Sequence, residues 1–278
     1  MSTLYIVATP IGNLEDLTLR AVRVLGEVPV VVAEDTRVTR KILDHIDSSS
    51  KIVSFHRRST KSDVHRIVRH LDNGDIALVS DAGTPGVNDP GQAIVAAAVA
   101  LGHDVVPLPG ASSIMAALSV SGLYVDQFIS HGFLPATGGK RRRLLNAVAQ
   151  EPAASVFFET PHRLRDALVD MAAVMPVRGL VICRELTKLH EEIWRGMAAE
   201  ALDHFDSPRG EFAIVVAPLE RGEAAASSIS EDDASEVINS AAAALRNRYE
   251  SRRDLVEAVA KKTGLPRRQV YQTLHREG

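Results

Sequence analysis

Four segments of this chain are rich in glycine, proline and small polar residues, and each directly follows a short apolar run. They are residues 9–13 (Thr-Pro-Ile-Gly-Asn), 34–37 (Glu-Asp-Thr-Arg), 80–91 (Ser-Asp-Ala-Gly-Thr-Pro-Gly-Val-Asn-Asp-Pro-Gly) and 109–113 (Pro-Gly-Ala-Ser-Ser). Glycine and proline fix such turns and let main-chain N–H and C=O groups approach a ligand closely. The four segments therefore predict a ligand site lined largely by backbone.

Two common phosphate-binding motifs are excluded. No Gly-x-Gly-x-x-Gly pattern follows the first apolar run, so a dinucleotide fingerprint is missing. Gly138-Gly139-Lys140 matches a P-loop only in part, because Arg141 stands where Ser or Thr is required and the upstream glycine is absent. The histidines and the single cysteine, Cys183, show no spacing typical of a zinc site, and we expect no metal.

The basic residues are unevenly distributed. The chain has 32 Lys and Arg against 35 Asp and Glu, a formal charge of −3, yet residues 245–276 hold nine basic and three acidic residues, a balance of +6. A second basic run, Lys140-Arg141-Arg142-Arg143, follows a Gly-Gly turn. This asymmetry is typical of an acidic catalytic body with a basic appendage for a polyanion, although a solvated helix face has the same composition.

The loops need a sheet to hold them. Residues 4–8, 28–33, 52–55, 76–80 and 104–108 have the pattern of strands, and residues 64–73 and 92–101 that of helices. Apolar strands that alternate with helices predict an α/β fold with a mostly parallel sheet covered on both faces. Ligands bind beyond the carboxyl ends of such strands, which is where the four loops lie.

The chain divides into three predicted units. An α/β domain covers 1–110, and a second α/β domain covers 111–220, with strands expected at 128–133, 155–159, 179–183, 192–196 and 211–217. Small and polar residues predict a linker over 221–230. No apolar run approaches the roughly 20 residues of a membrane span, and no signal peptide precedes the first strand, so we expect a cytoplasmic protein.

The last unit, 231–278, has the pattern of a helix-turn-helix. One helix is predicted over 252–262, Gly264 ends it, and a second begins with Pro266. Arg267 and Arg268 of the second helix suit contact with the phosphates of a nucleic acid. Small three-helix units that bind no nucleic acid share this pattern.

Six segments, in this order along the chain, resemble a known family. They are residues 7–16, 33–37, 80–86, 109–113, 157–163 and 184–188. Together they resemble ribosomal RNA small subunit methyltransferase I, of the tetrapyrrole methylase superfamily. The resemblance implies two α/β domains of the class III methyltransferase type, with S-adenosylmethionine in a cleft between them. It also implies 2′-O-methylation of a cytidine in 16S ribosomal RNA, free or in the 30S subunit, by a homodimer.

The same resemblance, carried over residue by residue, assigns contacts. Cofactor contacts are expected at Pro10, Ile11, Asp81, Thr84, Val87, Ser113, Ile114, Phe158, Cys183 and Phe212. The charge of the two basic segments, and not the resemblance, predicts RNA contacts at Lys140, Arg141, Arg142, Arg143, Arg267 and Arg268. Ile11, Ile114 and Phe212 have an alternative role as core residues, and Asp81 one as a turn cap.

Methyl transfer from a sulfonium to an alcohol is an in-line displacement, so positioning should dominate its catalysis. A base that takes the hydroxyl proton would assist, and the first candidates are Glu159, Glu185 and His162. Asp35 and Asp81 are less favoured candidates. The carboxylates have a simpler alternative as partners of neighbouring arginines, namely Arg163, Arg184 and Arg37.

Three other functions remain open at this point. The first is methylation of a tetrapyrrole, for which the basic run and the basic tail have no evident use. The second is a non-catalytic DNA-binding regulator whose α/β body senses a ligand. A more distant third is protein methylation of the diphthine type.

Overall fold

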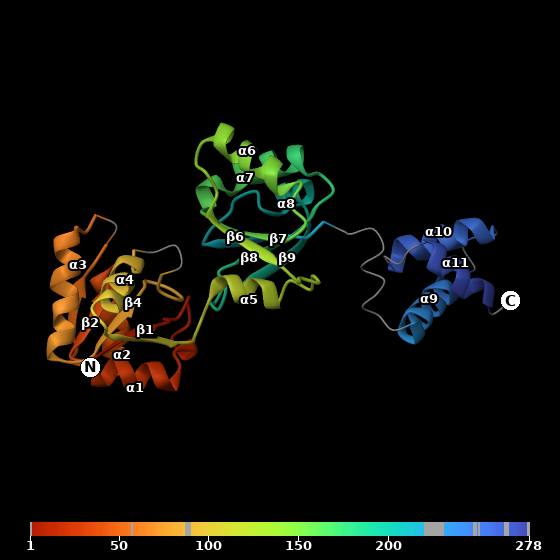
Figure 1. The fold of residues 1–278 in the computed structure, drawn as a ribbon. Coiled ribbons are helices and arrows are strands. Elements are labelled where there is room, and N and C mark those ends of the chain that lie inside the picture. Colours follow the sequence, from red (N-terminus) through yellow and green to blue (C-terminus); the bar gives the residue numbers. More distant parts are fainter. Residues whose placement is uncertain are drawn as a thin grey trace. The chain divides into compact units, whose positions relative to one another are not determined.

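The structure is a computed structural model of the chain, shown in Figure 1. It describes residues 2–56, 58–86, 90–219, 231–246, 249, 251–263 and 267–276. Contacts divide the chain into two compact units, Met1–Pro218 and Leu219–Gly278.

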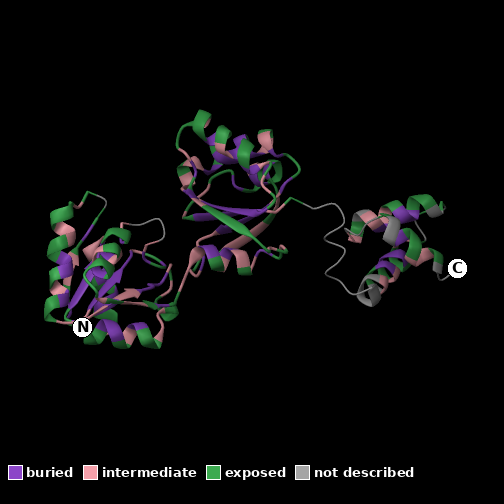
Figure 2. Ribbon diagram, in the orientation of Figure 1, coloured by how far each residue is buried: buried purple, intermediate pink, exposed green. Residues whose placement is uncertain are grey.

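The first sheet of the larger unit is parallel throughout. It contains β1 (Thr3–Val7), β2 (Val30–Ala33), β3 (Lys51–Ser54), β4 (Ile76–Val79) and β5 (Asp104–Leu108), in the order β3-β2-β4-β1-β5. Every residue of β2 and β4 is buried, as the two-sided cover of a parallel sheet requires (Figure 2). Val7 pairs with Val79 and with Leu108, so three of the predicted loops start at one edge.

Helices cover both faces of this sheet. On one face, α1 (Leu19–Glu27) and α2 (Thr36–His45) pack against Val31 and Val79. On the other, α3 (Lys61–Val68) and α4 (Gln92–Ala100) pack against Val32 and Leu78. The single helix expected over 64–73 is two elements, because a 3₁₀ turn, η2 (Arg69–Asn73), follows α3. A short 3₁₀ turn, η1 (Leu14–Asp16), precedes α1.

The second sheet is mixed. Its strands are β6 (Phe128–Phe133), β7 (Ala154–Glu159), β8 (Gly179–Arg184), β9 (Glu192–Met197) and β10 (Phe212–Val216), in the order β6-β7-β10-β8-β9. Only the β6–β7 pairing is parallel. One face packs under α6 (Gly138–Val148), α7 (Pro161–Val174) and α8 (Ala198–His204), and the other under α5 (Ser113–Ser119). The prediction of two α/β sheets is confirmed.

The smaller unit is helical. It contains α9 (Glu231–Leu245), α10 (Arg252–Thr263) and α11 (Arg267–Arg276), which share a core around Ile238, Val259 and Val270. Both helices predicted here are present, while the expected linker, 221–230, and the turn at Gly264 lie outside the described residues. No helix in the described part of the chain has the length and apolarity needed to cross a membrane.

Candidate functional site

The loops after β1 and β4 are joined into one piece. Thr9 and Gly83 exchange both backbone hydrogen bonds, with N···O distances of 2.9 and 3.0 Å. The buried Thr9 hydroxyl also donates to the Ser80 carbonyl at 3.0 Å. Gly83 has φ +76°, a conformation that favours glycine. The glycine therefore allows the turn that ties the two loops together.

The loop after β5 packs against the joined loops after β1 and β4. At Gly110, a Cβ atom would lie 2.9 Å from Cβ of Ala8, so only glycine fits without a shift of the backbone. The Thr84 hydroxyl donates to the Ala111 carbonyl at 3.5 Å. The structure thus brings three of the four loops together as a rim of main-chain groups.

The loop after β2 joins this rim through two carboxylates. Asp81 accepts the Asp35 N–H at 2.8 Å, and Asp35 caps α2 and pairs with Arg37 at 2.6 Å. The hydrogen bonds from the Arg37 side chain and backbone lower the pKa of Asp35 to about 2. A carboxylate with so low a pKa is a poor proton acceptor near neutral pH. Asp35 thus caps α2 and pairs with Arg37, the simpler role expected for it. Asp81 holds the Asp35 N–H as a turn cap would, and its contact with the cofactor stays a prediction.

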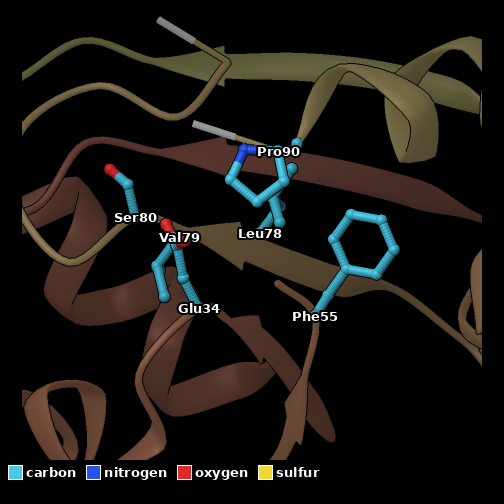
Figure 3. A pocket seen from close by; sticks show the side chains of 7 residues that line it. Glu34, Phe55, Leu78, Val79, Ser80 and Pro90 are labelled. Carbon is cyan, nitrogen blue, oxygen red and sulfur yellow. The ribbon is translucent and has the colours of Figure 1, made fainter. Parts of the chain in front are cut away.

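A small hollow opens at this edge of the sheet (Figure 3). It is lined by Glu34, Phe55, Leu78, Val79, Ser80, Pro90 and Gly91. Ser80 in this lining begins the loop that carries Gly83, so the hollow adjoins the rim.

Four of the expected cofactor contacts lie in one apolar cluster between α5 and the second sheet. They are Ile11, Ile114, Phe158 and Cys183. Ile11 belongs to the loop after β1, so this loop reaches from the first sheet to the second. Burial raises the pKa of the Cys183 thiol to about 11, which keeps the sulfur neutral and unreactive at neutral pH.

The other expected cofactor contacts are dispersed. Pro10 is buried, Ser113 is the first residue of α5, and Thr84 is exposed at the rim. Phe212 differs from expectation, because it lies on the opposite face of the second sheet, under the helices, with its ring centroid 5.6 Å from that of Phe205. Packing in that core accounts for Phe212. Val87 lies outside the described residues.

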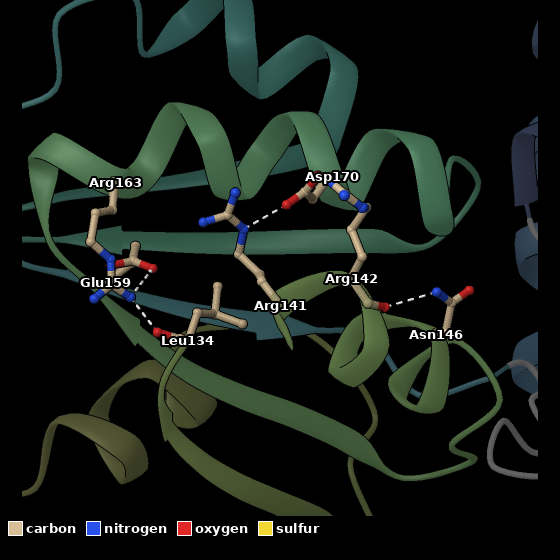
Figure 4. A network of polar contacts seen from close by, with 7 residues as sticks. All are labelled: Leu134, Arg141, Arg142, Asn146, Glu159, Arg163 and Asp170. Carbon is tan, nitrogen blue, oxygen red and sulfur yellow. Dashed lines mark hydrogen bonds and ion pairs between the residues drawn. The ribbon is translucent and has the colours of Figure 1, made fainter. Parts of the chain in front are cut away.

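Glu159 is enclosed by its own chain (Figure 4). Its side chain is fully buried, accepts the Thr160 N–H at 2.8 Å and pairs with Arg163 at 2.9 Å. Arg163 also donates to the Leu134 carbonyl. His162, in the first turn of α7, is exposed. Of these two candidates for the base, only His162 is open to a substrate.

Glu185, the third candidate, holds the turn between β8 and β9. It pairs with Lys188 at 2.8 Å and accepts the Glu211 N–H at 2.9 Å. The hydrogen bond from Lys188 is the main cause that lowers the pKa of Glu185. Lys188 also pairs with Glu211 at 2.9 Å. Glu185 is thus a structural partner of Lys188.

This turn is strained and touches the loop after β1. Glu185 and Thr187 have φ +50° and +68°, which non-glycine residues rarely adopt and which cluster at functional sites. A Cβ atom at Gly12 would lie 2.4 Å from Cγ of Lys188 and 3.0 Å from the Leu186 carbonyl oxygen. The Thr187 hydroxyl is buried with no hydrogen-bond partner in the described structure. Lys188 follows β8 and ends the segment 184–188, yet its type and spacing alone did not predict it as a site residue.

The basic run at the start of α6 has two faces. Lys140, Arg142 and Arg143 are exposed. Arg141 was expected at the surface as an RNA contact, but its side chain is only 7% exposed and pairs with the buried Asp170 at 2.6 Å (Figure 4). Arg142 pairs with the same carboxylate at 3.2 Å. The exposed face therefore carries three of the four cations, one of them partly neutralised.

The two arginines predicted in the tail differ in what the structure describes. Arg267 is exposed at the first position of α11 and pairs with Glu257 at 3.3 Å. The side chain of Arg268 lies outside the described part of the structure. Within that part, no group of three His, Cys, Asp or Glu residues has the arrangement of a metal site.

Comparison with known proteins decides the family. Residues 3–202 match the family model for Tetrapyrrole (Corrin/Porphyrin) Methylases. Ribosomal RNA small subunit methyltransferase I of Synechocystis sp. is 42% identical over 279 residues, which cover 98% of this chain and 97% of that protein. The protein of the same name from Halalkalibacterium halodurans is 40% identical, with coverage of 99% and 95%. This chain belongs to the ribosomal RNA small subunit methyltransferase I family.

Solved structures show the same fold. The cobalt-precorrin-4 methyltransferase of cobalamin biosynthesis matches with a TM-score of 0.59 and 15% identity, covering 77% of this chain and 94% of that one. Uroporphyrin-III C-methyltransferase from Thermus thermophilus, in complex with S-adenosyl homocysteine, matches with a TM-score of 0.55 and 19% sequence identity. The match covers 78% of this chain and 97% of that one. The prediction of a tetrapyrrole methylase fold is confirmed, and so is the predicted family.

Two relatives in the ribosomal RNA small subunit methyltransferase I family also match the helical unit. The two relatives cover 98% and 99% of this chain, whereas the two tetrapyrrole enzymes cover 77% and 78%. Similarity at this coverage includes most of α9, α10 and α11. The helical unit is therefore matched in these two relatives, whereas the relative from Thermotoga maritima matches 79% of this chain over 100% of its own length. The likeness to tetrapyrrole enzymes at under 20% identity concerns the fold alone.

Proposed function

We propose that this chain transfers a methyl group from S-adenosylmethionine to the ribose 2′-hydroxyl of a cytidine in 16S ribosomal RNA. The observation that carries the proposal is the 40–42% identity along the whole chain to proteins named for methylation of small subunit ribosomal RNA. The exposed cations of α6 fit a polyanionic substrate such as RNA.

The residues at the rim fit the cofactor. Gly83 and Gly110 allow the loops after β1, β4 and β5 to approach one another closely, and the buried Thr187 hydroxyl has a hydrogen bond to offer. Ile11, Ile114 and Phe158 supply apolar surface for a purine ring. When bound, S-adenosylmethionine supplies a methyl group activated by its sulfonium charge.

The chain itself contributes position and a proton acceptor. The bridge between Thr9 and Gly83 and the turn around Lys188 hold the loops that orient the reactants, which is the larger part of catalysis for a displacement between two bound groups. His162 is the proposed acceptor of the hydroxyl proton, because Glu159 and Glu185 are occupied by Arg163 and Lys188.

We also propose the setting in which the reaction takes place. The substrate is 16S ribosomal RNA, free or assembled in the 30S subunit, the compartment is the cytoplasm, and the active form is a homodimer. Sedimentation of the purified chain measures the last of these. A single species with the mass of one chain would contradict the dimer.

Transfer of radiolabel tests the function directly. Small subunits from cells that lack this protein are incubated with the chain and with methyl-labelled S-adenosylmethionine, and free 16S RNA is assayed in parallel. We expect label in the RNA at a cytidine. The phosphodiester bond that follows this cytidine should resist cleavage that requires a free 2′-hydroxyl. No label in either substrate, or label only in ribosomal protein, would contradict the proposal.

A further inference from the structure

One flank of α11 presents a stripe of three exposed side chains. Arg267, Tyr271 and His275 are spaced four residues apart and lie on one side of the helix. Val270 and Leu274, on the neighbouring side, pack into the core of the helical unit. We call Arg267, Tyr271 and His275 the α11 stripe.

The core of this unit does not use the tyrosine. The described core cluster consists of aliphatic side chains from α9, α10 and α11, while Tyr271 is 53% exposed. Its ring contacts that of His275, with centroids 4.3 Å apart and planes at 49°. Two adjoining rings thus present aromatic surface to solvent without a packing role in the core.

A cation stands at one end of the rings. Arg267 pairs with Glu257 of α10 at 3.3 Å, and these two side chains are 54% and 66% exposed. Exposed ion pairs stabilise a fold by only about 0–1 kcal/mol. Arg267 can therefore exchange this carboxylate for a phosphate at little cost, while the rings beside it remain in place.

We propose that the α11 stripe binds an unpaired strand of RNA, with a base stacked on the ring of Tyr271 and a phosphate held by Arg267. This inference rests on the proposed function, whose RNA substrate it narrows to a single-stranded element. An aromatic ring has a partner only where a base is unstacked, as in loops and single strands of RNA. In duplex DNA the bases are stacked on one another, so a helix in the major groove would leave the ring unused.

Binding of a single-stranded probe by the full chain tests the stripe. The probe is a fluorescein-labelled RNA of 12 nucleotides with no self-complementarity, and fluorescence anisotropy gives the Kd. We expect Tyr271→Ala to weaken binding about tenfold, within the range for loss of one stacked base, and Tyr271→Phe to bind like the wild type. Tyr249→Ala is the matched control, because Tyr249 is 41% exposed in the same unit but lies outside the stripe.

The salt dependence separates stacking from charge. Each phosphate contact on a single strand adds about 0.7 to the slope of log K against log salt. Arg267→Ala should reduce the slope by about that amount, whereas Tyr271→Ala should weaken binding at an unchanged slope. Circular dichroism melting checks that each variant is folded, which we expect because the replaced side chains are exposed.

Three results would contradict RNA binding by the α11 stripe. They are an unchanged Kd for Tyr271→Ala, an equal loss of affinity in Tyr249→Ala, and tighter binding of a DNA duplex of the same sequence than of the RNA probe. Methyl transfer by the wild type to undermodified small subunits is measured separately. If the wild type transfers the methyl group and any of the three results is found, only the proposal for the α11 stripe is wrong. If the wild type transfers no methyl group, the proposed function is wrong whatever the RNA probe shows.

Discussion

The arginines at the start of α6 and those of α11 look alike in the sequence but lie in opposite environments. Arg141 is buried against Asp170, whereas Arg267 and its partner Glu257 are both more than half exposed. A buried pair cannot lose one member without leaving a charge in the protein interior, and an exposed pair can. Exposure, and not the number of cations in a run, therefore decides what a polyanion can reach.

The same contrast separates the candidate bases. Glu159 is a fully buried carboxylate held by Arg163 and the Thr160 N–H, while His162, three residues later, is exposed. The buried group fixes the start of α7 relative to β7, and the exposed one is available to a substrate. In both comparisons the buried member maintains the fold and the exposed member is the candidate for function.

The largest effect is expected from Arg141→Ala. This change leaves Asp170 buried with only the weaker partner Arg142, and breaking a buried ion pair costs about 3–5 kcal/mol in the free energy of unfolding. Urea denaturation followed by circular dichroism measures it. Arg143→Ala is the control, because Arg143 is exposed in the same turn and should change stability by less than about 0.5 kcal/mol. Equal losses in the two variants would contradict the distinction between buried and exposed cations.

A smaller effect, on rate and not on stability, is expected from His162→Ala. Loss of a general base lowers a rate by about 10²-fold or more, equivalent to about 2.7 kcal/mol, and an exposed side chain contributes little to folding. Glu159→Gln is the matched change at a buried position, and it should destabilise the fold while the folded fraction keeps its rate. Single-turnover methyl transfer and urea denaturation of both variants measure these quantities. A rate loss confined to Glu159→Gln would reverse the assignment.

Much of the fold could be predicted from the sequence because the strands are short apolar runs. Strands buried on both sides, such as β2 and β4, need continuous apolar residues, and their observed bounds lie within two residues of those predicted. The convergence of the loops also follows from the sequence, since parallel strands end at one edge. The break between α3 and η2 was missed because helical periodicity continues across it.

The placement of single side chains was harder to predict. Arg141 shares its face of α6 with Leu145 and Val148, so the helical spacing did contain a signal that this arginine points inward. Its partner Asp170 lies on another helix, and no local pattern links the two. The parity of β10 likewise places Phe212 with Ile214 and away from Ala213. The contact of Gly12 with the turn at Lys188 joins segments far apart in the chain, and only the tertiary structure shows it.

Loss of the exposed cations of α6 should lower the affinity for RNA by about one order of magnitude. Lys140 and Arg143 form no ion pair in the described part of the chain, so both are open to phosphates. If each contacts one phosphate, Lys140→Ala with Arg143→Ala reduces the slope of log K against log salt by about 1.4–1.8. Filter binding of 16S RNA between about 50 and 200 mM salt measures the slope. Stability should remain as in the wild type, and an unchanged slope would remove α6 from the RNA-binding surface.

The smallest effect concerns the second partner of the buried carboxylate. Burial opposes the charge of Asp170, but the hydrogen bonds from Arg141 and Arg142 outweigh it, and the pKa of Asp170 is lowered. A carboxyl whose pKa is lower in the folded state contributes stability that is present above its unfolded pKa of about 3.9 and is lost as the pH falls through the folded value.

Arg142→Ala should bring this pKa back toward its usual value, at a cost of less than about 1 kcal/mol at pH 7, because Arg142 is more than half exposed. Urea denaturation at pH 7 and at about pH 3 measures the difference between the wild type and this variant. The difference should shrink as the pH falls below the unfolded pKa of about 3.9, because the wild type, with the lower folded pKa of Asp170, has more of this stability to lose. A difference that stays constant would mean that Arg142 stabilises α6 through its packing and not through its charge. Asp170 would then depend on the buried Arg141 alone.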